Sequence, residues 1–325
     1  MRLDVDAWDP GYGTGLDTGG AADRSTAQLD TDVETPAAAW RPIGPPAGVS
    51  GPAVVLLVDG VRRLDARVWI TDDDGTTHGG MAASYAAGVV RCDLRRGLAE
   101  VAVSRTERGL FTSSPEAGDV TAGVVRYPAV RVGRDEPMDL LLAVQRQLRQ
   151  LEITVAGEAR SWSADDDDLL VVDGPLQGRA HLPRAMGYVK SHKVEYLPPE
   201  LTGVVSGLRP GERCPVFGLG TSWHRYAWYL RLPGPAGSPW AGIVRAECSA
   251  DITVAEAVAL ADRSLVTLPR FASTAYKDPR APQNLVPIAG LERRLRATLG
   301  DARLLHRSLS LAARRTRAGE TARSG

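Results

Sequence analysis

The sequence predicts a mixed α/β fold, in which a central mixed β-sheet is flanked by helices and followed by a C-terminal hairpin and further helices. Two short apolar runs, AVVLLVDG (53–60) and LLVVDGPL (169–176), each reach an Asp-Gly pair, which is typical of buried central strands. A long helical pattern (137–159) lies between them, and hairpin patterns follow. Strands and helices in this order predict a sheet covered by helices.

Hairpin-connected strands are predicted before that helix. The first apolar run is expected to end at its Asp-Gly pair, and DDDGTTHGG (72–80) has strong turn chemistry. Residues 81–92 and 98–104 have the pattern of two further strands, so three strands joined by hairpins are expected. A polar, turn-rich stretch (105–136) then leads to the helix.

The helix over 137–159 is predicted by apolar residues at helical spacing and by Pro137 near its start. The apolar positions are Leu140, Leu141, Val144, Leu148, Leu151 and Val155. After the second apolar run we expect a strand end within 184–197, a hairpin from 223–233 and 240–248, and helices over 254–263 and about 287–318.

Composition excludes several classes of protein. The 325 residues are 43% hydrophobic and 24% charged, as in ordinary globular proteins. No apolar run approaches the ~20 residues that span a bilayer, and the N-terminal segment is acidic and Gly-rich, unlike a signal peptide. Three cysteines without a CxxC pair argue against a secreted disulfide scaffold. We therefore expect a cytoplasmic protein without a membrane partner.

The net charge of zero is the sum of two oppositely charged ends. Residues 1–40 carry two basic and eight acidic side chains (−6), and residues 293–325 carry nine basic and two acidic ones (+7). We expect an acidic, disordered arm (1–50), a folded domain (51–310) and a basic tail (311–325). The basic end is either a solvated tail or an electrostatic footprint for phosphates.

Two aspartates form the strongest candidate for a site. Asp59 and Asp173 each follow an apolar strand, where a carboxylate is costly to desolvate unless it is paired or binds a cation. Each Asp-Gly pair is alternatively a structural turn. Glu152 lies on the predicted helix, and Glu158 is its rival for the helical position. With Glu152, the three carboxylates are the oxygen donors that Mg²⁺ or Mn²⁺ prefers.

Such a metal site is suited to phosphodiester hydrolysis. Divalent cations about 4 Å apart activate a water, orient the phosphate and stabilise the departing oxyanion. Lys190 is then the natural charge to neutralise a phosphate oxygen or orient the nucleophile, and its alternative is a solvated surface lysine. No Gly-rich segment follows a phosphate-loop pattern, so we do not expect ATP binding.

The order of these motifs resembles the NurA nuclease family. The resemblance is carried by DG after the first strand, Glu on a helix, DGPL, GYVKS, YLRLP and IVRAE, and spans about residues 53–300. It implies an RNase H-like core, homodimerisation, and partnership with a HerA-type hexameric ATPase. It also implies Mn²⁺-dependent single-strand endonuclease and 5′-to-3′ exonuclease activity in DNA end resection and double-strand break repair. Asp59, Glu152 and Asp173 match the family's metal-binding carboxylates, and Lys190 matches its lysine.

The sequence departs from the family at two places. Val61 stands where the family usually has Ser after the first DG, and the segment APQNLVPIAGLERRL (281–295) lacks the family's histidine. His306, further along the chain, is a possible replacement. An alternative function is therefore a catalytically weak or silent scaffold that docks on a DNA-translocating ATPase and modulates it. A third hypothesis is an RNase H-like enzyme acting on RNA or on hybrids.

Overall fold

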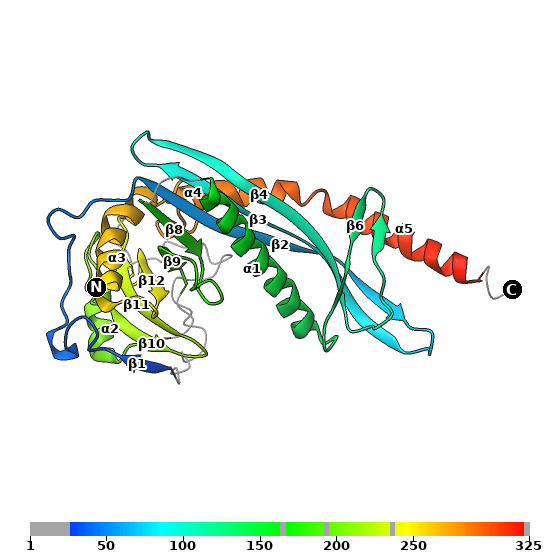
Figure 1. Cartoon of the computed structure of the whole chain (residues 1–325), viewed down its shortest axis with the longest axis horizontal. Coiled ribbons are helices and arrows are strands. Elements are labelled where there is room, and N and C mark those ends of the chain that lie inside the picture. The colour runs from blue at the N-terminus through cyan, green and yellow to red at the C-terminus, as the bar shows by residue number, and fades with distance from the viewer. Residues whose placement is uncertain (1–26, 163–166, 192–194, 235–237, 322–325) are drawn as a thin grey trace. The chain divides into compact units, whose positions relative to one another are not determined.

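The computed structural model describes residues 27–162, 167–191, 195–234 and 238–321, and for 316–321 the backbone only (Figure 1). The chain divides into two compact units. Unit 1 comprises Met1–Val58, Val90–Glu100 and Ser163–Gly290, and unit 2 comprises Asp59–Val89, Val101–Trp162 and Leu291–Gly325. The part of the predicted N-terminal arm before residue 27 lies outside the described residues.

Unit 1 contains a mixed sheet with the strand order β1-β10-β11-β12-β9-β8-β2. Strand β8 is parallel to both β2 and β9, and the remaining pairs are antiparallel. The strands are β1 (Gln28–Asp30), β2 (Val54–Thr71, in part), β8 (Asp168–Asp173), β9 (Ala185–Val189), β10 (Phe217–Gly220), β11 (His224–Arg231) and β12 (Ile243–Ser249). The predicted hairpin is the β11–β12 pair.

The helices of unit 1 are α2 (Pro199–Ser206) and α3 (Val254–Thr267), with short 3-10 turns at Ala37–Ala39 and Leu268–Phe271. Helix α3 begins with a capping box in which Thr253 and Glu256 bond to each other's backbone amides. It packs on β11, where the buried indole of Trp228 donates to the hydroxyl of Ser264 over 3.1 Å.

Unit 2 contains the strand order β2-β3-β4-β7, and its long strands contribute residues to both units. The strands are β3 (Thr77–Asp93), β4 (Leu98–Thr112) and β7 (Ala129–Arg131), and β5 (Val120–Ala122) pairs with β6 (Val125–Tyr127) in a separate hairpin. The stretch 105–136, which the sequence shows as polar and turn-rich, begins with the end of β4, because this strand continues to Thr112 through the buried Leu110 and Phe111.

Helices cover both faces of the long strands in unit 2 (Figure 1). Arg62 of β2 bonds to Gln145 of α1 (Pro137–Ser161). The next residue, Arg63, donates to the carbonyls of Leu299 and Gly300, which follow α4 (Val286–Thr298). Successive side chains of a strand point to opposite faces, so α1 and the end of α4 lie on opposite faces of β2.

The single helix expected over about 287–318 is two helices, α4 and α5 (Ala302–Thr321). Gly300 separates them with a φ of 80°, a conformation that glycine adopts without steric cost. Asp301 then accepts the amide of Leu304 over 2.9 Å at the start of α5. Arg63 and Arg108 both donate to the carbonyl of Leu299, a favourable place for cations.

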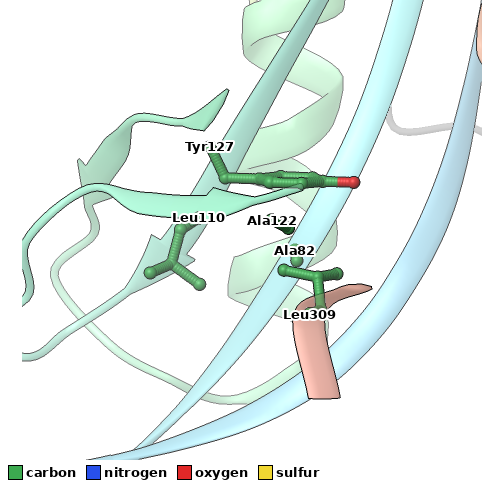
Figure 2. Close-up of a cluster of buried hydrophobic side chains, with 5 residues drawn as sticks. All are labelled: Ala82, Leu110, Ala122, Tyr127 and Leu309. Atoms are coloured by element: carbon green, nitrogen blue, oxygen red, sulfur yellow. The ribbon is translucent and has the colours of Figure 1, made fainter. Parts of the chain in front are cut away.

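Helix α5 closes a small hydrophobic core of unit 2, shown in Figure 2. Leu309 packs with Ala82, Leu110, Ala122 and Tyr127. The helix is thus part of the folded unit where its side chains are described, and its arginines at 303, 307, 314 and 315 are exposed.

The predicted mixed α/β fold, with a central mixed sheet flanked by helices, is confirmed, as are the C-terminal hairpin and helices. The predicted domain boundaries at 50 and 310 stay predictions. Residues 28–30, inside the predicted arm, form β1 and pair with β10, and Trp40 is buried. Residue 310 lies within α5.

Candidate active site

The two candidate aspartates follow paired residues of neighbouring parallel strands. In unit 1, β2 and β8 are in register through Val58 and Val172, and Asp59 and Asp173 are the next residues along the chain. The first strand does not end at its Asp-Gly pair as predicted, because β2 continues to Thr71. Asp59 is partly buried, and its carboxylate accepts the amide of Gly60 over 2.7 Å.

Glu152 lies against the backbone beside Asp59 in unit 2. It is on the buried face of α1 and only 5% exposed. A Cβ atom at Gly60 would stand 2.7 Å from Oε1 of Glu152 and 2.7 Å from Cδ1 of Leu148. A side chain at this position would require Glu152 and Leu148 to shift, so Gly60 allows the Glu152 carboxylate to lie next to β2.

Glu158, the rival on the same helix, is directed elsewhere. Its two carboxylate oxygens accept Nη2 and Nε of Arg105 on β4, over 2.5 and 3.0 Å. This bidentate pair with a guanidinium occupies both oxygens of Glu158. We therefore keep Glu152 in the candidate ligand set.

Asp173 and Lys190 meet in unit 1. The ammonium of Lys190 donates to Oδ2 of Asp173 over 2.6 Å and to Oδ1 of Asn284 over 3.0 Å. The Asn284 amide donates in turn to Oδ2 of Asp278 over 2.5 Å. Lys190 is 14% and Asp173 13% exposed in their side chains, so this lysine is not a freely solvated surface residue.

The hydrogen bonds that connect Asp173 to Asp278 pass through Asn284. This residue belongs to the segment in which the resemblance implies a histidine. Within 281–295, Asn284 is fully buried and bonds to Lys190, and the carbonyl of Gln283 accepts the hydroxyl of Tyr188 over 2.6 Å. Complete burial, together with the negative charge of Asp173, raises the pKa of Tyr188 well above its usual range. His306 lies exposed on α5 in unit 2.

Two polar residues at this place escaped the sequence analysis. Asn284 is a buried amide that follows the equally buried Gln283, and Glu247 is a fully buried carboxylate within β12. Neither was singled out there as a candidate for the site. Glu247 also ends the IVRAE segment.

The chemistry of the candidate donors suits a hard divalent cation, because carboxylate oxygens are its preferred ligands. Asp59 and Glu152 adjoin Gly60 in unit 2, while Asp173 lies in unit 1 against Lys190. Within the residues that the structure describes, no group of three or more His, Cys, Asp or Glu side chains is arranged to hold a metal ion.

Comparison with solved structures finds nucleases of low similarity to this chain. The NurA nuclease from Sulfolobus solfataricus is 10% identical, with 80% of this chain and 84% of that chain covered and a TM-score of 0.46. Endonuclease V from Bacillus subtilis is 12% identical over 78% and 84%, with a TM-score of 0.36. The catalytic domain of human endonuclease V is 17% identical over 77% and 83%, with a TM-score of 0.32.

No family model and no curated protein matches this sequence. Among the described helices, none is both long and apolar enough to cross a membrane.

Proposed function

We propose that this protein is a metal-dependent DNA nuclease, a phosphodiester hydrolase. The observation that carries the proposal is the parallel register of β2 and β8 through Val58 and Val172, which brings both strands to an aspartate at the next residue. The approach of Glu152 to Gly60, beside the first aspartate, supports it. Asp173 lies at the carboxyl end of β8, and Asp59 follows the part of β2 that pairs with β8 in parallel. Ligands often bind outside the carboxyl ends of parallel strands.

In this proposal Asp59, Glu152 and Asp173 are the ligands of Mn²⁺ or Mg²⁺. The cation, when bound, supplies charge to polarise the phosphate and acidify a water. Lys190 neutralises a phosphate oxygen or orients the nucleophile, and Asn284 and Asp173 fix the position of its ammonium. The cationic arginines of α5 contact the DNA backbone.

The finer assignment rests on the motif resemblance. We propose a NurA-type enzyme with Mn²⁺-dependent single-strand endonuclease and 5′-to-3′ exonuclease activity. It would act as a homodimer with a HerA-type hexameric ATPase in DNA end resection and double-strand break repair. Asn284 bonds to Lys190 from within the segment that lacks the family's histidine, so this assignment does not require His306.

Two glutamates on one helix give the test a matched control. Purified full-length protein should cut single-stranded DNA when Mn²⁺ is added. Asp59→Asn, Asp173→Asn and Glu152→Gln should each abolish cutting while the thermal unfolding curve stays cooperative. Glu158→Gln removes a carboxylate of the same type from the same helix and should leave cutting intact. Full activity in both aspartate variants would refute the assignment.

A second candidate function is a silent scaffold that docks on a DNA-translocating ATPase. It is favoured by the lack, within the described residues, of three carboxylate or histidine side chains arranged as a metal site. Calorimetric titration with Mn²⁺ separates the two functions. The nuclease should bind Mn²⁺ stoichiometrically and lose that binding in Asp173→Asn, whereas the scaffold should show no stoichiometric binding.

A further inference from the structure

The turn after Asp173 is held by two separate parts of unit 1, the strands β9 and β12. Gly174 has a φ of 101°, and it exchanges backbone hydrogen bonds of 2.8 and 3.1 Å with Tyr188 of β9. Two residues later, the amide of Leu176 donates to Oε1 of Glu247 on β12 over 2.7 Å. The main chain that carries Asp173 is thus fixed from β9 and from β12.

Gly187 shows how closely these parts meet. A Cβ atom at this position would lie 2.8 Å from the amide nitrogen of Leu176, 2.9 Å from Cγ of Glu247 and 3.0 Å from the carbonyl oxygen of Gly174. Any side chain on Gly187 would therefore push the turn away from β9 or Glu247 away from the turn. The glycine is required by close packing here.

Glu247 is a buried charge with a defined set of partners. It is fully buried, and its Oε2 atom lies 3.0 Å from Nε of Arg225 and 3.5 Å from Nη2 of Arg245. Both arginine side chains are at most 7% exposed. A carboxylate taken out of water needs such compensation, and removing one member of the group leaves the others uncompensated.

We propose that Glu247 is the positioning residue for Asp173. Its Oε1 atom accepts the amide of Leu176 in the turn, and its Oε2 atom forms ion pairs with Arg225 and Arg245. In this proposal Glu247 acts on Asp173 through the turn and is not itself a metal ligand. The inference deepens the proposed nuclease function and rests on it for its metal-binding consequence. Its structural consequence, the geometry of the pair between Asp173 and Lys190, can be measured independently.

The test uses the lysines as reporters, because the sequence contains only Lys190, Lys193 and Lys277. Side-chain ¹⁵N spectra of the full-length protein, assigned through single Lys→Arg variants, give one resolved signal for the Lys190 ammonium. Glu247→Gln removes the charge, and Gly187→Ala displaces the turn without changing any charge. We expect both variants to shift the Lys190 signal and to weaken Mn²⁺ binding roughly ten- to hundred-fold, the usual effect of altering residues that support metal ligands.

Ser264→Ala is the control for lost stability, because it removes a buried hydrogen bond to Trp228 that does not involve the turn. It should leave both the Lys190 signal and Mn²⁺ affinity unchanged. In the unaltered protein, the Leu176 amide should exchange with deuterium as slowly as those of β12. An unshifted Lys190 signal in both test variants, or rapid exchange at Leu176, would overturn the inference. If the Lys190 signal shifts in the test variants but the unaltered protein does not bind Mn²⁺, the inference about Glu247 is supported and the proposed nuclease function is refuted.

Discussion

The ammonium of Lys190 lies 2.6 Å from Oδ2 of Asp173, and both side chains are largely shielded from water. Charge-assisted hydrogen bonds of this length are among the stronger ones in proteins. This lysine therefore has a fixed position beside a candidate metal ligand, which a solvated lysine would lack.

Replacing Lys190 by Met should lower DNA cleavage by roughly 10²- to 10³-fold, the usual effect of losing one stabilising charge on an oxyanion. Mn²⁺ binding should not weaken, because the variant removes a competing cation from Asp173. Cleavage assays and calorimetry measure the two effects. Lys277→Met is the control, since Lys277 lies over the exposed ring of Tyr276. Equal activity in both variants would contradict a catalytic role for Lys190.

Replacing Gly60 by Ala should destabilise the protein by about 1–3 kcal/mol, as overpacking does, because the new Cβ would meet Glu152 and Leu148. It should also abolish cleavage by displacing Glu152. Gly157→Ala, on the exposed side of the same helix, should instead stabilise the protein by about 0.5–1 kcal/mol. Chemical denaturation measures both changes. A neutral Gly60→Ala variant would mean that Glu152 does not lie where we describe it.

Replacing the exposed arginines at 303, 307, 314 and 315 by Gln should weaken DNA binding and flatten its salt dependence. The slope of log K against log salt concentration should fall by about 0.9 for each phosphate that the variant no longer neutralises. Deleting residues 293–325 is a poorer test, because Leu305 and Leu309 of α5 are buried and their loss would damage unit 2. An unchanged slope in the arginine variant would exclude α5 from the DNA-binding surface.

The three cysteines should be unreactive in the folded protein. Burial raises the pKa of Cys92, Cys214 and Cys248 to about 12 each, against about 8.5 in an unfolded chain. Iodoacetamide at pH 8 should therefore modify none of them until guanidinium is added. Because the folded state holds these protons more tightly, stability should fall as the pH rises from about 8.5 towards 12. Rapid alkylation of the native protein would contradict this.

The regular elements were predictable where hydrophobic periodicity was local. The run before Asp59, the helix containing Glu152 and the β11–β12 hairpin all have such patterns. The continuation of β2 through Gly60 was not predictable, because an Asp-Gly pair usually marks a turn. In this strand the glycine instead lets Glu152 lie close to the backbone. Tertiary contact overrode local preference there.

The surroundings of the site were less predictable than the elements. The contact of Lys190 with Asp173 joins the residue after β9 to the last residue of β8, and the parallel register of these strands cannot be inferred from either segment alone. Asn284 and Glu247 contribute through burial, which a single sequence does not display for polar residues. The choice between Glu152 and Glu158 likewise depends on Arg105, far from both along the chain.

The chain moves from one unit to the other at residues 58–59, 89–90, 100–101, 162–163 and 290–291. Neither unit is therefore a continuous stretch that could be expressed or exchanged as a module. During synthesis, β2, β3 and β4 are made long before Leu309, which completes the small core around Tyr127. Unit 2 can close only when the chain as far as Leu309 has left the ribosome, and its nascent strands need protection until then.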